Sequence, residues 1–330
     1  MAVILQFDRF GGPDVLQFRD VVPPLPAAQE VRYRVEAFAL NRGDLFWIED
    51  RYYNSPQFPA RVGQEAYGVV DAVGAGVCGF TPGDRVCSLV QDDGRYCVNG
   101  EFAISLARDL VHWTGPDNPE AGCAMWSQAL TAYYPMVELS RLGPGDTILV
   151  TAGASTAGNG AIQMAKLLGA RVIATSRTLA KRDFLRAIGA DVVIATDCET
   201  LDARVREETG GRGVDLVYDT VAGPMMPCYL GCLAPWAKIY IVGALSEDFG
   251  LSGPILPLIR AGASITGFSV FNHNRIDEQL GRAKQFIAGA IAEGRLRPII
   301  DRVFPFERTI EAYRYLASGV QRGKVIVRLA

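Results

Sequence analysis

The sequence predicts an α/β protein with two domains, one rich in β-strands and one built on a doubly wound parallel sheet. The chain has 330 residues, about twice the usual length of one domain. Short apolar runs separated by turn signals fill its first 110 residues, and strands alternate with helices from about residue 119. Its residues are 49% hydrophobic and 21% charged, which is ordinary for globular domains and excludes extensive disorder.

The charge balance and the cysteines limit the partners and the compartment. A net charge of −3 gives no electrostatic reason to bind nucleic acid or anionic lipid. Seven cysteines without a C-x-x-C pair predict free thiols in a reducing compartment. The start lacks the features of a signal peptide, and the uncharged stretch 147–165 holds too many glycines and polar residues for a membrane span. We therefore expect a cytoplasmic protein with no membrane or nucleic-acid partner.

The β-rich part comes first along the chain. Apolar runs at 31–38, 66–73 and 84–90 are typical of strands, and turns rich in proline and glycine separate them. A long apolar segment then predicts a helix over 123–142.

The rest of the chain alternates between strands and helices. Strands joined through helices of this length run parallel, so the alternation predicts a doubly wound sheet. The predicted strands are 147–151, 171–175, 192–195, 214–219, 238–242 and 264–268, with helices at 159–168, 179–188 and 201–208. Helices near 277–293 and 306–318 and a strand at 324–329 complete the chain. We place the β-rich domain at 1–122 with 268–330, and the doubly wound domain at 123–267.

The strongest local motif lies in the stretch 147–165. A buried strand leads into a turn of small residues from Gly153 to Gly158, and a helix follows. Small residues let a pyrophosphate approach the backbone closely, and a helix N-terminus offers free N–H groups to it. Because a strand, a helix and a second strand surround this turn, we interpret it as a dinucleotide-binding loop rather than a purely structural turn.

The end of the second strand predicts which dinucleotide binds. NAD-selective sites carry an acidic residue there, for the ribose 2′-hydroxyl. This chain instead has Ser176, Arg177 and Lys181, and no acid occurs before Asp183. A hydroxyl, a guanidinium and an ammonium all suit a 2′-phosphate, so the sequence predicts NADPH.

Taken in order, the motifs resemble the medium-chain dehydrogenase/reductase superfamily and, within it, the zinc-independent quinone oxidoreductase (zeta-crystallin-like) branch. The resemblance covers nearly the whole chain. The segments that carry it are 10–16, 41–45 (N-R-G-D-L), 63–70 (G-Q-E-A-Y-G-V-V), 73–77, 83–86, 130–133, 143–146, 219–223 and 323–325.

The resemblance implies a GroES-like β domain plus a Rossmann domain, with the active site between them, and a homodimer. Carried over by position, it implies that Asn41, Gln128 and Thr131 lie near the nicotinamide. The other implied cofactor contacts are Ser155, Thr156, Ala157 and Gly158 at the pyrophosphate, Ser176, Arg177 and Lys181 at the 2′-phosphate, Gly243, Ala244, Leu245, Gly267, Phe268 and Ser269 beside the nicotinamide half, and Lys324.

The metal ligands of the zinc-dependent members of the superfamily are missing. Those members take ligands from a Cys near positions 41–42 and from a His in a G-H-E segment, which reads Gly63-Gln64-Glu65 here. Only Cys97 lies where a structural zinc would need four cysteines, and His112 and His273 have no ligand partner at a useful spacing. The sequence therefore predicts no metal, which disfavours ordinary alcohol oxidation.

Without a metal, the predicted reaction is hydride transfer from NADPH to a small conjugated carbonyl, either a quinone or an α,β-unsaturated ketone or enoyl compound. Such acceptors delocalise the incoming charge by themselves. The catalytic candidates are Asn41 and Tyr53, because Tyr53 lies twelve residues before Glu65, where the quinone oxidoreductases also carry a tyrosine. A phenol can donate a hydrogen bond to a developing enolate, although Tyr53 can equally be an aromatic wall.

Several alternatives remain open at this stage. Glu65 can be a structural carboxylate, and Trp47, Trp126 and the segment 91–98 can shape a pocket or, for the tryptophans, simply pack in the core. The chain can also be a metal-free carbonyl reductase or alcohol dehydrogenase of a biosynthetic pathway, or a cofactor-binding protein without enzymatic activity.

Overall fold

A computed structural model describes residues 1–116 and 118–330. The chain divides into two compact units, which are Met1–Ser127 with Arg297–Ala330, and Gln128–Leu296. One unit is rich in β-strands and the other contains a parallel sheet, so the predicted α/β class is confirmed. The predicted domain limits at residues 122 and 267 were drawn from the alternation of elements, and they stay a prediction.

The first unit contains two sheets. The larger has the strand order β15-β16-β3-β5-β6-β8, with β7 paired to β3, and the smaller has the order β2-β1-β4. In β3, Val31, Tyr33 and Val35 are buried while Arg34 is exposed, which is the period of two expected of a strand. The strands are β1 (Ala2–Phe7), β2 (Gln17–Val21), β3 (Glu30–Leu40), β4 (Ala60–Arg61), β5 (Glu65–Val73), β6 (Arg85–Ser88), β7 (Phe102–Leu106), β8 (Leu110–His112), β15 (Ile300–Pro305) and β16 (Lys324–Arg328).

The α-helices of the described first unit, apart from the start of α3, are α1 (Arg42–Ile48), α2 (Pro119–Cys123) and α11 (Thr309–Ala317), and α2 and α11 pack on strands of the larger sheet. Helix α11 contacts both α1 and β16, and its Tyr313 is fully buried. The end of β3, the start of α1 and the start of β16 therefore meet around one part of the core, although they are far apart in the sequence.

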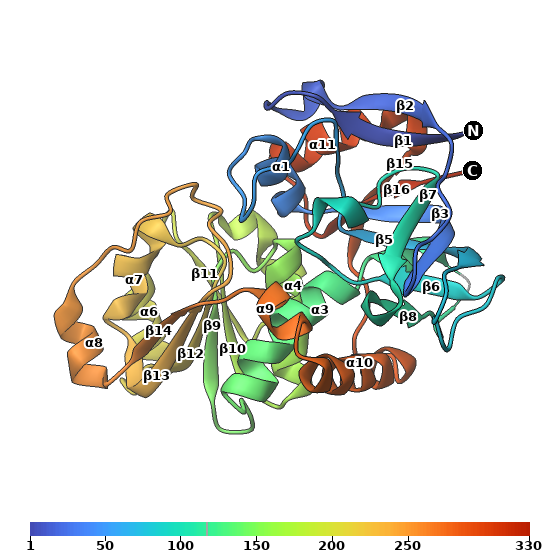
Figure 1. The fold of residues 1–330 in the computed structure, drawn as a ribbon. Helices are drawn as coiled ribbons and strands as arrows, with labels where there is room; N and C mark the ends of the chain where they lie inside the picture. The colour runs from blue at the N-terminus through green and yellow to red at the C-terminus, as the bar shows by residue number, and fades with distance from the viewer. Residues whose placement is uncertain (117) are drawn as a thin grey trace. The chain divides into compact units, whose positions relative to one another are not determined.

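The second unit is a doubly wound sheet. Its six parallel strands have the order β11-β10-β9-β12-β13-β14 (Figure 1). The order reverses beside β9, and ligands bind at such a point in parallel sheets. The strands are β9 (Thr147–Val150), β10 (Arg171–Ser176), β11 (Val192–Ala195), β12 (Val214–Asp219), β13 (Leu233–Ile241) and β14 (Ser264–Gly267). The helices are α3 (Trp126–Tyr133), whose first two residues belong to the first unit, α4 (Thr156–Leu167), α5 (Arg182–Ala187), α6 (Leu201–Glu208), α7 (Met226–Leu230), α8 (Ile255–Ala261), α9 (Val270–Asn274) and α10 (Asp277–Ala292).

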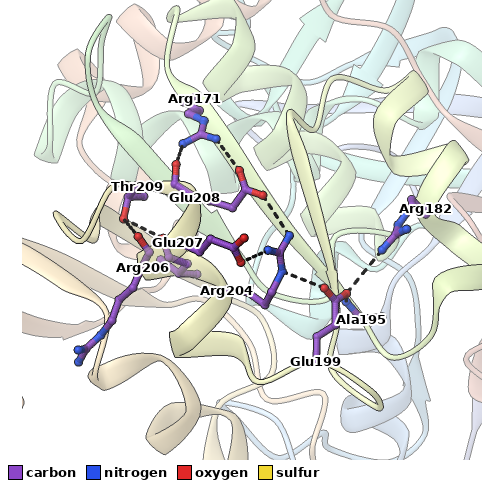
Figure 2. A network of polar contacts seen from close by, with 10 residues as sticks. Arg171, Arg182, Ala195, Glu199, Arg204, Arg206, Glu207, Glu208 and Thr209 are labelled. Atoms are coloured by element: carbon purple, nitrogen blue, oxygen red, sulfur yellow. Dashed lines mark hydrogen bonds and ion pairs between the residues drawn. The ribbon is translucent and has the colours of Figure 1, made fainter.

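A network of ion pairs connects β10, β11 and α6 in this unit. Figure 2 shows the Arg204 guanidinium bonded to Glu199, Glu207 and Glu208. Arg171, at the start of β10, also pairs with Glu208, at 2.8 Å. The side chains are partly exposed, so the network fixes geometry and contributes modestly to stability.

The structure corrects one predicted element and adds several short ones that were not predicted. The single helix over 123–142 is wrong, because α2 ends at Cys123, α3 begins at Trp126, and a π-helix covers Tyr134–Leu139. Pro135 lacks an N–H and disturbs the regular helical bonding there. The unpredicted elements include α1, α7, α8, α9 and β15, each seven residues or fewer and too short to show a clear period. In the described part of the chain, no helix is long and apolar enough to cross a membrane.

Candidate functional site

The cofactor residues expected in the second unit gather at one edge of its sheet. The loops that follow β9, β10, β13 and β14 carry them. These strands are parallel, so their carboxyl ends lie along the same edge, where dinucleotides bind in folds of this kind. The expected contacts come from five separate stretches of sequence, and the sheet brings four of them together.

The loop after β9 has the features of a phosphate cradle. Ser155 caps α4, and its Oγ accepts the Gly158 amide at 3.0 Å. A Cβ at Gly158 would lie 2.6 Å from the Ala152 carbonyl oxygen and 2.7 Å from that of Gly153, so only glycine fits. Thr156 and Ala157 form the first turn of α4. The turn therefore lets a phosphate group approach the backbone closely, and it places that group at the N-terminus of a twelve-residue helix.

A buried carboxylate fixes this loop to the neighbouring strand. Asp219, at the end of β12, is fully buried, and its Oδ1 accepts the Thr151 hydroxyl at 2.8 Å and the Val221 and Ala222 amides at 2.9 and 3.1 Å. Its Oδ2 accepts the Tyr229 hydroxyl at 2.8 Å. The carboxylate therefore has a donor on both oxygens and holds the ends of β9 and β12 together.

The residues expected at the 2′-phosphate lie at the end of β10. Ser176 is the last residue of this strand, and the exposed Arg177 follows it directly. Lys181 closes the short 3-10 turn Leu179–Lys181 before α5. A hydroxyl and two cations thus follow the strand beside β9, in the arrangement that suits a phosphate ester.

The remaining expected contacts of the second unit lie on three elements. Gly243, Ala244 and Leu245 follow β13, and the Leu245 amide donates to the Thr220 carbonyl at 3.0 Å. Phe268 is buried and stacks on His273, with ring centroids 5.3 Å apart, and Ser269 precedes α9. Gln128 and Thr131 lie three residues apart on α3, and a Cβ at Gly160 would be 2.8 Å from the Gln128 Cβ, so α4 packs tightly against α3.

In the first unit, Asn41 lies at the centre of a buried polar network. Its Oδ1 accepts the Lys324 ammonium at 2.7 Å, and its Nδ2 donates to Glu65 Oε2 at 3.2 Å. Lys324 also forms an ion pair with Glu65 Oε2, and the exposed fractions of the two side chains are 0% and 1%. Glu65 Oε1 accepts the Ser127 amide at 2.7 Å. Two long-range partners, Lys324 and Glu65, therefore fix the carboxamide of Asn41.

A second buried carboxyl, Asp44, belongs to the same network. Its Oδ2 accepts the Asn41 amide at 2.8 Å and the Tyr313 hydroxyl at 3.2 Å, and Tyr313 in turn accepts Asn99 Nδ2 at 2.7 Å. Asp44 Oδ1 is buried and has no hydrogen-bond partner within residues 1–116 and 118–330. Burial raises the pKa of the Asp44 carboxyl from 3.8 to about 7, against the opposing effect of its hydrogen bonds and of Lys324.

Asp44 also lines a small, half-open cavity within the first unit, with room for about one water molecule. The other lining residues include Trp47, Tyr52 and Gln64, whose Nε2 donates to the Tyr52 hydroxyl at 3.4 Å. Tyr53 is 57% exposed and its ring packs edge-on against Tyr52, at 4.6 Å between centroids. The complete lining is Asp44, Trp47, Tyr52, Gly63, Gln64, Gln91, Asp92, Asp93, Gly94 and Cys97.

The two tryptophan candidates differ in whether they line this cavity. Trp47 lines the cavity, and its Nε1 donates to the Arg61 carbonyl at 3.0 Å, which fixes the ring. Trp126 is buried and is not part of the lining. The segment 91–98 contributes five residues beginning with Gln91, so Trp47 and this segment together shape the hollow.

The donor set of the cavity does not fit a catalytic zinc. Zinc prefers thiolate, imidazole and carboxylate ligands. Burial raises the pKa of the Cys97 thiol to about 12, so it stays protonated, and the neighbouring Glu65 is already paired with Lys324. No group of three or more His, Cys, Asp or Glu side chains that could hold a metal occurs anywhere in residues 1–116 and 118–330.

Sequence reasoning assigned no role to Asp44 and did not predict the pairing of Lys324 with Glu65. The spacing of Asn41 and Asp44 is that of a capping box, which was a usable signal for the local hydrogen bond. Nothing in the sequence connects Lys324 to residues 259 and 283 positions earlier, so this pairing needed the structure.

Comparisons with known proteins agree with this architecture. Residues 27–134 match the alcohol dehydrogenase GroES-like domain, and residues 157–285 match the zinc-binding dehydrogenase family. These two matches correspond to the β-rich part and to the parallel-sheet part, so the predicted GroES-like and Rossmann domains are confirmed.

The similar proteins also span the whole chain. A quinone oxidoreductase from Pseudomonas aeruginosa is 31% identical over 329 residues, covering 99% of each chain. A 2-haloacrylate reductase from Burkholderia sp is 28% identical and covers 96% of each chain. The structure of Escherichia coli quinone oxidoreductase complexed with NADPH has a TM-score of 0.89 and 27% identity, and covers 99% of both chains. This chain belongs to the medium-chain dehydrogenase/reductase superfamily, in its quinone oxidoreductase branch.

Proposed function

We propose that this protein is an NADPH-dependent, zinc-independent reductase that transfers hydride to a conjugated carbonyl, either a quinone or an α,β-unsaturated ketone or enoyl compound. The observation that carries the proposal is the polar lining of the cavity in the first unit, which offers phenol, carboxyl and amide groups but no metal donor set. A substrate reduced without a metal has to stabilise its own developing charge, and conjugated carbonyls do so. The similar quinone oxidoreductases and the 2-haloacrylate reductase support the same substrate class.

The second unit fits the cofactor. The Ser155–Gly158 turn binds the pyrophosphate, and Ser176, Arg177 and Lys181 bind the 2′-phosphate. The stretches 243–245 and 268–269, with Gln128 and Thr131, border the nicotinamide half. When bound, NADPH supplies the hydride, and the protein orients the substrate and manages the proton.

The first unit binds the substrate. Tyr53 is more than half exposed and is held by its edge-on contact with Tyr52, so a substrate can reach its hydroxyl. Its phenol donates a hydrogen bond to the carbonyl oxygen as negative charge develops there. Asn41 presents a fixed carboxamide, and Lys324 acts through Asn41, because its ammonium is fully buried against that side chain and Glu65.

The protein also forms a homodimer through the β14 edge of the parallel sheet. Strand β14 has no partner on its outer side among the described strands, and Ser264, Thr266 and Gly267 are exposed. Helix α8, next to this edge in Figure 1, buries none of its residues, and its large apolar side chains Ile255, Leu256 and Ile259 are 60–69% exposed. An exposed apolar surface beside an open strand edge is typical of a protein interface.

The cysteines support a cytoplasmic location. All seven are free thiols in the structure, as in proteins from reducing compartments.

A substrate panel tests the proposal. Purified protein is incubated with NADPH and a quinone, an enone, a saturated ketone or an aldehyde, before and after chelator treatment, and NADPH oxidation is followed. Turnover of the quinone and the enone that survives chelation is the expected result. Turnover of the saturated ketone alone would favour a carbonyl reductase, and chelator-sensitive turnover would contradict the metal-free chemistry.

A further inference from the structure

The buried network around Asn41 holds two carboxyl groups and one ammonium group. Glu65 and Lys324 form an ion pair, and among the described residues no cation bonds to Asp44. With Asp44 protonated, the network carries no net charge, which is the favourable state for groups buried away from water.

The hydrogen bonds of Asp44 are compatible with a proton on one of its two carboxyl oxygens. Oδ2 accepts two hydrogen bonds, from the Asn41 amide and the Tyr313 hydroxyl, and both stabilise a lone pair on that oxygen. Oδ1 is buried, lacks a partner within the described residues, and belongs to a residue that lines the cavity. A neutral carboxyl therefore carries its proton on Oδ1.

We propose that Asp44 is the proton source for the carbon atom that is protonated when an α,β-unsaturated carbonyl is reduced, and that it acts through water in the cavity that it lines. This inference rests on the proposed reductase function. It gives Asp44 a chemical role that its helix-capping bond with Asn41 does not require.

The step balances. Hydride addition, with NADPH as the reductant, forms a C–H bond at the β-carbon and moves the π electron pair onto the carbonyl oxygen as an enolate. The enolate then takes a proton at its α-carbon from a water molecule, while Oδ1 of Asp44 gives its proton to that water. Asp44 is left as a carboxylate that Asn41 and Tyr313 still bond, and a solvent proton restores the neutral acid.

The charged and titratable groups that face Asp44 come from several elements. They are Glu65 on β5, Tyr313 on α11 and Lys324 on β16, with Tyr52 and Cys97 from loops and Asp92 and Asp93 on the same cavity. Burial raises the pKa of the Tyr52 phenol and of the Cys97 thiol, so both stay neutral through the neutral range. Burial raises the pKa of the Asp44 carboxyl to about 7, within the neutral range.

Comparing the reduction of quinones with that of enones distinguishes a proton-donating Asp44 from a purely structural one. Reduction of a quinone leaves a hydroquinone oxyanion, which bulk water protonates rapidly on oxygen. Reduction of an enone requires protonation on carbon, which is slow without a positioned acid. In the wild-type enzyme we expect kcat for the enone to fall as pH rises through about 7, and kcat for the quinone to change little across the same range.

The test compares Asp44→Asn with a matched control, Asp84→Asn. In both aspartates Oδ2 accepts the amide of the residue three positions earlier, at 2.8 Å from Asn41 and at 2.7 Å from Thr81, but Asp84 does not line the cavity. We expect Asp44→Asn to lower kcat for the enone about tenfold to a hundredfold and to abolish its pH dependence near 7, with less than about threefold change for the quinone. Asp84→Asn keeps the wild-type profile for both substrates.

A measurement on the unmodified protein covers the case in which Asp44→Asn does not fold. Infrared difference spectra should show a carboxylic acid C=O band that disappears as pH rises through about 7. Equal losses for enone and quinone in Asp44→Asn, or no such band in the wild type, would overturn the proton-source role. Quinone turnover without enone turnover at any pH would also overturn it while leaving the reductase proposal intact, whereas turnover of neither substrate would remove the reductase proposal itself.

Discussion

Two buried aspartates, one in each unit, differ in how fully their carboxylates are bonded. Asp219 accepts four hydrogen bonds, three on Oδ1 and one on Oδ2. Asp44 accepts two bonds on Oδ2, and its Oδ1 has none within the described residues. Both side chains are 0–1% exposed, so the difference lies in their partners and not in their depth.

The comparison separates a structural carboxylate from a reactive one. Asp219 is surrounded by donors from the turns that follow β9 and β12 and from α7, and its bonds hold the loop that we assign to the cofactor. Asp44 lines the cavity of the first unit, and its buried Oδ1 has no hydrogen-bond partner within the described residues. A fully bonded buried carboxylate stabilises a fold, and a half-bonded one beside a cavity can exchange a proton.

The largest effect is expected from Asp219→Ala, which leaves two backbone amides and two hydroxyls without their acceptor. Each unsatisfied buried donor costs about 1–3 kcal/mol, so the free energy of unfolding should fall by at least about 4 kcal/mol. Urea denaturation measures it. Asp183→Ala, on an exposed position of the same unit, should change it by less than about 0.5 kcal/mol. A loss below about 1 kcal/mol for Asp219→Ala would remove the structural half of the comparison.

Asp44→Asn should alter the pH dependence of stability. Between about pH 4 and pH 7 the folded protein holds a proton on Asp44 that the unfolded chain has lost, because burial raises the pKa from 3.8 to about 7. The contribution of Asp44 to the free energy of unfolding therefore falls as pH rises through this window, by at most about 4 kcal/mol at about 1.4 kcal/mol per pH unit. Denaturation of the wild type and Asp44→Asn at several pH values measures the difference, and parallel curves would show that Asp44 does not titrate there.

Tyr53→Phe separates hydrogen bonding at the carbonyl oxygen from protonation at carbon. The ring stays in place, so the pocket keeps its shape. We expect a loss of about 2–4 kcal/mol of transition-state stabilisation for an enone, roughly thirty- to a thousand-fold in kcat, with unchanged NADPH affinity. The inflection near pH 7 should remain, since it belongs to Asp44. A change in kcat below about threefold would make Tyr53 only a wall of the pocket, and Tyr52→Phe would then be the next variant to measure.

Arg177→Ala should give the smallest effect and leave both aspartate networks untouched. Loss of one charge-assisted hydrogen bond to the 2′-phosphate is worth about 1.5–3 kcal/mol, which corresponds to roughly ten- to a hundredfold weaker NADPH binding. NADH binding should stay within about threefold, and so should the stability. Fluorescence titration with both dinucleotides measures the ratio, and equal losses for NADPH and NADH would mean that Arg177 does not contact the phosphate.

The parallel-sheet unit could be predicted from the sequence because its information is local. A buried strand, the turn ending at Gly158 and the following helix are contiguous, and so is the basic end of the next strand at Arg177. Such local patterns can be recognised without knowing which distant residues they contact. The helix predicted over 123–142 failed for a local reason as well, because Pro135 changes the helical bonding where apolar composition alone suggests continuity.

The polar network of the β-rich unit could not be predicted from the sequence, because its partners are far apart along the chain. Asn41, Asp44 and Glu65 acquire their roles from Lys324 and Tyr313, which lie 259–283 positions away and reach them through β16 and α11. Period-two patterns predict that strands exist, but they do not tell which strands meet. The exposed apolar helix α8 was missed because it is seven residues long and its side chains face outward, contrary to the pattern of a packed helix.

The most direct test of the whole account is the fate of two hydrogen atoms in one turnover of an enone. The substrate is reduced in ordinary water with NADPH that carries deuterium at its hydride position, and then in heavy water with unlabelled NADPH. We expect cofactor deuterium on the β-carbon and solvent deuterium on the α-carbon of a saturated ketone, from protein treated with a chelator. Cofactor deuterium on the carbonyl carbon of an allylic alcohol would contradict hydride transfer to the conjugated position, and with it the role of Asp44.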